Sequence, residues 1–283
     1  YGDAKWEDAQ GNIIPYETQK SQLLSDVTYY ALWEADVKLY GIWNTASGDT
    51  LQGSVRVAYG KNFYIPPCSL PGYTFKGWTI SGTTLITNSA GYSLRPFSLT
   101  TDFQLYAKGE ARSYTVTLNP QGGFGGTREV TAVYEQPMPI SVDGLAIVCP
   151  TKEGYVFAGY YTKPDKDGTC FYDAHMKPTE NVWNIPESAT LYAGWDNKEV
   201  YITFNKQGGT GGTSYITVTY GKEMPKATAP TRNNYVLIGY FDQPNGMGAK
   251  YYDGPNMISV KEWDKEDDTT LYAYWRGAYY NIS

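Results

Sequence analysis

The sequence predicts a mainly β protein that is built as an elongated tandem array of small repeats. One order of landmarks recurs at a spacing of about 80 residues: an alternating strand, a glycine-rich turn, a second alternating strand, a tyrosine-rich segment and a closing Leu-Tyr-Ala strand. A fixed recurring spacing is the mark of a repeat array. The chain has 28 Tyr and 8 Trp but only 18% charged residues, a mix typical of β structure with a half-buried surface.

The landmarks divide the chain into five segments. Residues 1–34 match the C-terminal half of a truncated repeat, because a closing strand at 26–33 has no glycine-rich hairpin before it. Residues 35–112 form a divergent repeat, 113–197 and 198–276 two regular ones, and 277–283 a tail that we expect to lead to a further module. The chain begins at Tyr1 rather than Met, so we expect targeting information to lie outside it.

The fourth repeat shows the elements most clearly. Residues 200–205 and 216–220 alternate apolar and polar side chains, which is typical of half-buried strands. The run Gly208–Gly212 between them predicts a hairpin turn, because glycine reaches positive φ without steric cost. A lone hairpin is marginal in water. The segments 234–240 and 271–275 therefore supply the further strands of the sheet.

The third repeat follows the same order, and the second departs from it. In the third, Tyr114, Val116 and Leu118 alternate with threonines, and Gly122–Gly126 is the turn. The second has an irregular first strand and lacks the final Trp. Prolines in the middle stretches, such as 168–188, leave room for one short helix at most.

These landmarks resemble the Listeria–Bacteroides repeat, the B-repeat of internalin-type bacterial surface proteins. The resemblance covers three copies and a partial one, and the block Gly154–Tyr161 carries it most clearly. Asn233 and Asn234 replace the usual glycine before Tyr235. The resemblance implies α+β, β-grasp-like units, exposure on a bacterial cell surface, and a role as stalk or adhesive module. Its motif carries no catalytic residue, cofactor or metal ligand.

The residues themselves offer little catalytic chemistry. The glycine-rich turns lie between two strands and lack the Gly-Lys-Ser/Thr ending of a phosphate loop. His175, the only histidine, has no Glu or Cys at ligand spacing, which favours a solvated loop residue. A repeat array also lacks the deep cleft in which carboxylate pairs are tuned. We therefore expect no enzyme.

Two acidic segments leave a cation site open as an alternative. Asp165–Gly168 resembles the start of a calcium loop, but the terminal bidentate Glu is missing, so a turn is favoured. Residues 262–268 concentrate acids around Trp263, and we expect a solvated loop there, with a weak cation site as the alternative. Of the three cysteines, Cys149 and Cys170 share a repeat and could pair.

The composition and the aromatic residues limit the classes of partner that we expect. The net charge of −6 argues against nucleic acid, and no apolar run approaches the roughly 20 residues of a membrane span. We expect an extracellular monomer that acts as a spacer and binds host or matrix protein. The alternative is a glycan-binding module, suggested by the aromatic surplus. The candidate exposed aromatics, each of which could instead be core, are Tyr160, Tyr161, Phe241, Tyr251 and Tyr252.

Overall fold

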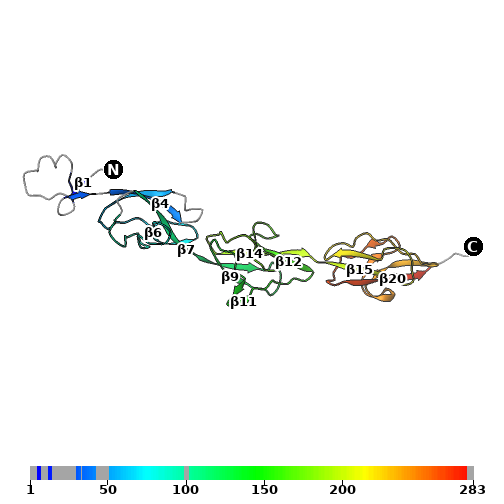
Figure 1. Ribbon diagram of the computed structural model, residues 1–283. Coiled ribbons are helices and arrows are strands. Elements are labelled where there is room, and N and C mark those ends of the chain that lie inside the picture. The colour runs from blue at the N-terminus through cyan, green and yellow to red at the C-terminus, as the bar shows by residue number, and fades with distance from the viewer. Residues whose placement is uncertain are drawn as a thin grey trace, which may run out of the picture. The chain divides into compact units, whose positions relative to one another are not determined.

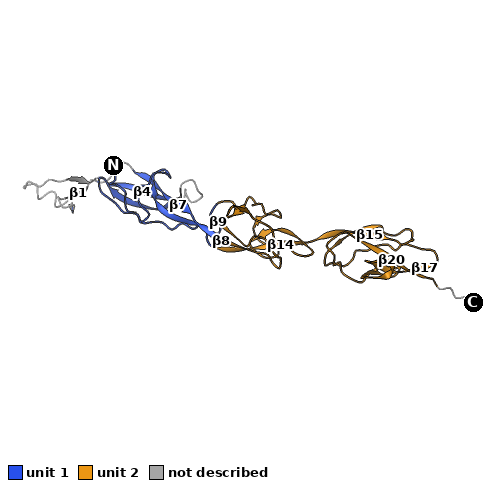
Figure 2. Ribbon diagram, turned by 90° about the horizontal axis from the view of Figure 1, so that it is seen from below, with its two compact units in different colours: residues 1–114, 133–135, 184–187 blue, residues 115–132, 136–183, 188–283 orange. Residues whose placement is uncertain are grey.

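The computed structural model describes residues 5–7, 12–14, 30–32, 34–42, 51–98 and 102–278. Almost all regular structure in these residues is β-strand, as the sequence predicts (Figure 1). The single helical segment among them is the 3₁₀ turn η1 (Pro244–Gly246). The chain groups into two compact units (Figure 2). Unit 1 is Tyr1–Tyr114, Val133–Glu135 and Asn184–Glu187, and unit 2 is Thr115–Ala132, Gln136–Trp183 and Ser188–Ser283.

The described residues of unit 1 form two sheets. The larger has the order β5-β4-β7-β6. Its strands are β4 (Glu34–Ile42), β5 (Leu51–Ala58), β6 (Tyr73–Thr79) and β7 (Phe103–Ala111). The smaller has the order β2-β1-β3 and is made of β1 (Lys5–Glu7), β2 (Ile13–Ile14) and β3 (Tyr30–Leu32). Most of the predicted truncated repeat, 1–34, and of the tail lies outside the described residues.

Unit 2 is built on two larger sheets. The first has the order β13-β12-β14-β8-β9, from β8 (Ser113–Asn119), β9 (Glu129–Val133), β12 (Tyr155–Tyr161), β13 (Cys170–Tyr172) and β14 (Ala189–Asn197). The second has the order β16-β15-β20-β17-β18-β19, from β15 (Glu199–Asn205), β16 (Tyr215–Thr219), β17 (Tyr235–Phe241), β18 (Lys250–Asp253), β19 (Ile258–Ser259) and β20 (Thr269–Gly277). The strands β10 (Ser141–Val142) and β11 (Leu145–Ala146) form a separate hairpin.

The three main sheets share one topology. In each, the first and last strands are parallel neighbours, namely β4 with β7, β8 with β14 and β15 with β20, and we call each such pair the parallel pair. The other ladders are antiparallel. Each parallel pair lies inside its sheet, with a further strand on both sides. Parallel neighbours need a long connection between them, and here the middle of each repeat is the connection that brings the closing strand back beside the first.

The predicted alternation decides which side chains form the cores. Along β15, Val200, Ile202 and Phe204 are buried and the residues between them are exposed. The main sheets of the second and fourth repeats each bury their own aliphatic and aromatic cluster. Trp78, Trp183 and Trp263 are among the largest fully buried side chains. Much of the aromatic surplus therefore stabilises small cores, since units of this size bury only a modest share of their surface on folding.

A glycine interrupts the third long strand of every main sheet at the same place. Gly77, Gly159 and Gly239 have φ of 141°, 129° and 153°, and the ladder shifts register beside each of them. A Cβ on Gly159 or Gly239 would lie 2.5 or 2.3 Å from the carbonyl oxygen of Tyr172 or Tyr252. The glycine thus allows both a β-bulge and the close approach of the next strand.

Candidate functional site

Four of the five aromatics that we expected to be exposed are buried. Tyr160, Tyr251 and Tyr252 are 0% exposed and Phe241 is 9% exposed, so the prediction of exposed contact residues is wrong for them. Tyr161 is half-buried. Tyr160 faces the core because its ring packs edge-on against Phe157.

Two buried tyrosines bind the strands β13 and β18 to the proline-containing links of their repeats. Tyr172 donates its hydroxyl to the carbonyl oxygen of Pro139, and Tyr252 does the same to Pro225. Burial raises the pKa of both hydroxyls, so they stay protonated and act as donors. These residues are structural, and the prediction misplaced Tyr252 because the strand β18 was not recognised in the sequence.

His175 and the Asp165–Gly168 segment are parts of turns. His175 is exposed, and its backbone N–H donates to Asp173. Asp165 and Lys166 have φ near +60°, and Asp167 accepts a bond from the N–H of Gly168. Hydrogen bonds from Gly168 and Lys163 lower the pKa of Asp167. This local bonding accounts for the sequence motif without a cation.

The acidic segment 262–268 is solvent-exposed at Glu262, Asp264, Asp267 and Asp268, as predicted, and some of its carboxylates also bind neighbouring segments. Asp264 accepts a hydrogen bond from the Tyr251 hydroxyl and pairs with Lys261. Burial alone raises the pKa of Asp264, but these two donors outweigh it and hold the pKa below its usual range. Asp268 accepts from the backbone N–H of Tyr201. Within the described part of the chain, no three His, Cys, Asp or Glu side chains gather as a metal site.

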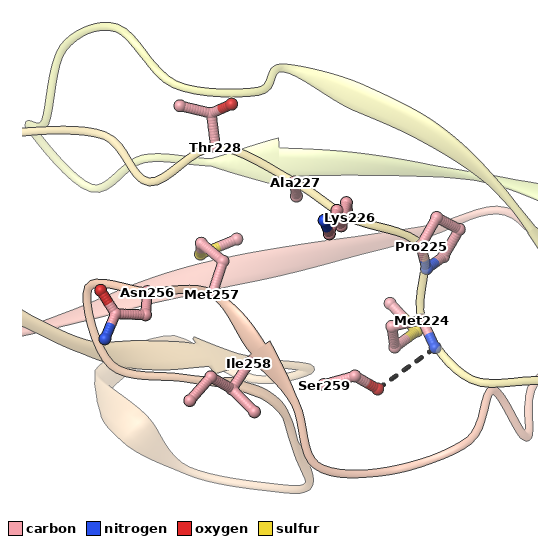
Figure 3. Close-up of a pocket in the computed structure, with 9 residues that line it drawn as sticks. All are labelled: Met224, Pro225, Lys226, Ala227, Thr228, Asn256, Met257, Ile258 and Ser259. Carbon is pink, nitrogen blue, oxygen red and sulfur yellow. Dashed lines mark hydrogen bonds between the residues drawn. The ribbon is translucent and has the colours of Figure 1, made fainter.

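A groove of about 470 Å³ lies in the fourth repeat, between two chain segments (Figure 3). One wall is Met224–Thr228 and the other is Asn256–Ser259. The Ser259 hydroxyl accepts a hydrogen bond from the N–H of Met224 and closes one end. Lys226 is the single charged residue of the lining. Acid–base chemistry in this groove has no pair of titratable groups to use.

The chain link that forms one wall of the groove has a different length and fold in the third repeat. There the link from Pro139 to Pro150 is longer than the link from Pro225 to Pro230, and it folds as the hairpin of β10 and β11. This hairpin region exposes large apolar side chains: Ile140 by 68%, Leu145 by 74% and Val148 by 60%. Clustered exposed apolar side chains are typical of protein contact sites. The sequence signal for it was the length difference between the two repeats.

The junction between the third and fourth repeats is a single residue, Lys198, between β14 and β15. Its N–H donates to the carbonyl oxygen of Gly154, and its own carbonyl oxygen accepts from the N–H of Tyr220. The N–H of Gly154 in turn donates to Glu266 at 3.0 Å. The junction residue therefore has backbone partners in both repeats.

The ring of Tyr220 covers Gly154 at this junction. A Cβ on Gly154 would lie 2.2 Å from that ring, and Gly154 has φ of 75°. Unit 1 contains a matching arrangement: Arg112 donates to the carbonyl oxygen of Gly72 and accepts from Tyr134. The equivalent residue of the fourth repeat is Asn234, also at positive φ. The sequence showed this glycine and its replacement but not what packs on it.

A family model for the Listeria-Bacteroides repeat domain matches residues 40–108, 114–193 and 201–274. The chain belongs to this family. The three matches coincide with the three main sheets. The resemblance recognised in the sequence is thereby confirmed.

Relatives of the Listeria-Bacteroides repeat chain include two proteins of Evansella cellulosilytica, each 26% identical to it. One, "Putative membrane protein", matches over 90% of the chain and 34% of its own length. The other, "Putative Gly-rich membrane protein", matches over 91% and 26%. Internalin H of Listeria monocytogenes is 29% identical over 36% of the chain and 17% of its own length. The chain thus spans about a third or less of these relatives.

Two further expectations concern cysteines and membranes. Cys68, Cys149 and Cys170 are all unpaired and partly buried, so Cys149 and Cys170 do not form a disulfide in this structure. Burial raises the pKa of the Cys170 thiol, which disfavours the thiolate. Within the described ranges, no helix has the length and apolar character to cross a membrane.

Proposed function

We propose that the chain is a non-catalytic spacer region of a bacterial cell-surface protein. The parallel pair carries this proposal. Because the first and last strands run in the same direction side by side, the chain enters each repeat at one end of the sheet and leaves at the other. A repeat of this kind adds the length of its sheet to the distance between the segments that flank it.

The register gives that length. Tyr192 lies opposite Asn119, and β14 continues five residues further, to Asn197. Asn197 is therefore about eleven residues along the sheet from Ser113, or roughly 36 Å at 3.3 Å per residue. In the fourth repeat, Asn205 lies opposite Tyr272, and Gly277 is again five residues beyond, so the offset is the same.

The junction and the relatives support the same function. A single bonded residue leaves little slack between the third and fourth repeats. Two relatives carry the name of membrane proteins and a third that of an internalin. Surface attachment, which the segments outside this chain would supply, fits a spacer that separates a terminal domain from the cell wall.

Deletion of one repeat tests the spacer. Removing 113–197 from the chain should shorten its maximum dimension in small-angle scattering by about 36 Å. On the producing bacterium, antibodies against the chain should label intact cells. An unchanged dimension, or labelling only after lysis, would contradict the proposal.

Protein binding through the third repeat is a second candidate, favoured by the exposed hairpin of β10 and β11. The partner would be a host or matrix protein that covers Ile140 and Leu145. Leu145→Ser should reduce binding to immobilised matrix proteins at least tenfold, whereas Val260→Ser, at an exposed position of the fourth repeat, should not. Hits on a glycan array, with protein binding equal in both variants, would favour a glycan partner instead.

A further inference from the structure

We infer that each repeat is a load-bearing element, in which the parallel pair resists force applied through the two ends of the repeat. This inference goes beyond the spacer role, because a spacer needs length but not resistance to pulling. It rests on the direction in which the chain crosses each sheet, not on surface location. The fourth repeat shows it best, since all of its strands are described.

The pulling direction is fixed by the topology. Force on Glu199 and Gly277 pulls β15 and β20 in opposite directions along their common axis. The ladder between them runs from Ile202 opposite Thr269 to Asn205 opposite Tyr272, which is four residue pairs. The hydrogen bonds of this ladder are then loaded together, whereas pulling the two strands apart from one end would break them one after another.

The ladder is also protected from water. Both strands have a neighbour on their outer edge, β16 beside β15 and β17 beside β20, so neither edge is open. An apolar pair lies in the middle of each parallel ladder with both side chains buried. These pairs are Leu39 with Leu105, Leu118 with Leu191, and Phe204 with Leu271. Water that could replace a stretched hydrogen bond must first displace this packing.

The junction passes the load from one repeat to the next. β14 ends at Asn197 and β15 begins at Glu199, so the covalent path of tension into the fourth repeat runs through Lys198. The backbone bonds of Lys198 to Gly154 and Tyr220 tie that residue to both repeats. The parallel pairs of the third and fourth repeats thus act in series.

Single-molecule pulling in two directions tests the inference. Cysteine handles are placed in the whole chain with Cys68, Cys149 and Cys170 changed to Ser. One variant carries Glu199→Cys and Gly277→Cys and shears the ladder. The other carries Glu199→Cys and Asp267→Cys, an exposed position just before β20, and peels the ladder from one end. Thermal melting checks that both remain folded.

The shear force should exceed the peel force about three- to fourfold, since four residue pairs share the load in one case and one pair in the other. Leu271→Ala should lower the shear force more than Leu237→Ala, which removes an equally buried leucine outside the parallel pair. Equal forces in the two directions, or equal effects of the two alanine variants, would overturn the inference. The deletion experiment can succeed or fail independently, because it measures length alone.

Discussion

Gly154→Ala tests whether the third and fourth repeats are coupled through the packing of Tyr220 on a bare glycine. The substitution has two separate costs. Alanine at φ of 75° is strained by roughly 1–2 kcal/mol. The added Cβ also displaces the Tyr220 ring, whose centroid lies 6.0 Å from that of Tyr155, and loss of that contact costs about 0.5–1.5 kcal/mol. The junction should lose roughly 1.5–3.5 kcal/mol in total.

Two further variants separate these costs. Gly154→Asn keeps the displacement of Tyr220 but relieves most of the backbone strain, because asparagine tolerates this conformation, as Asn234 does in the fourth repeat. Combining Gly154→Ala with Tyr220→Ala keeps the strain but removes the clash. The single changes should therefore be non-additive.

Native-state hydrogen exchange is the assay, since the N–H groups of Lys198 and Tyr220 are bonded across this junction. A loss of roughly 1.5–3.5 kcal/mol should accelerate their exchange about 10- to 400-fold. The N–H of Phe204, bonded to Ser214 inside the fourth repeat, should change little. Acceleration of less than about fivefold at Lys198, or equal acceleration at Phe204, would refute the coupling.

Three other predictions follow from individual side chains. Trp78→Phe should cost about 1–2 kcal/mol more in denaturant unfolding than Trp263→Phe, because the Trp78 indole donates to the carbonyl of Pro66 whereas the buried Trp263 indole has no hydrogen-bond partner among the described residues. The lowered pKa of Asp264 stabilises the fold above the ordinary aspartate pKa. Stability should therefore fall as the pH drops from the ordinary aspartate pKa to the lowered one, and it should fall less in Asp264→Asn. Burial raises the pKa of Tyr160 and Tyr240 to about 12, so absorbance titration should show late-ionising tyrosines, and stability should fall between pH 10 and 12.

Local patterns in the sequence were sufficient for the hairpins and for the fold class. Alternation along β15 and the glycine run after it correctly predicted a half-buried strand and a turn. The repeat spacing correctly indicated several small sheets rather than one. The alternation and the turn depend on neighbours within a few residues, and the spacing repeats along the chain, so a single sequence displays all three directly.

The strand β18 and the groove depend on contacts between segments that are separated in the sequence, and the sequence could not show these contacts. Tyr251 and Tyr252 follow a glycine and precede a turn, so they looked like loop aromatics. They are buried because Gly239 lets β18 approach β17, twelve residues earlier in the chain. The residues next to a tyrosine pair in the sequence do not indicate whether its side chains will be buried or exposed.

The parallel pair is the feature on which both proposals, the spacer and the load-bearing repeat, depend. Antiparallel first and last strands would return the chain to the end where it entered, and adding repeats would then add little length. The parallel arrangement instead gives length and places the ladder with its buried apolar pair under shear when the ends are pulled. All three matched repeats keep this pairing, while the segments after Pro139 and Pro225 differ. This supports the proposal that the shared topology serves spacing and load, and that any contacts specific to one repeat are made by the variable segments.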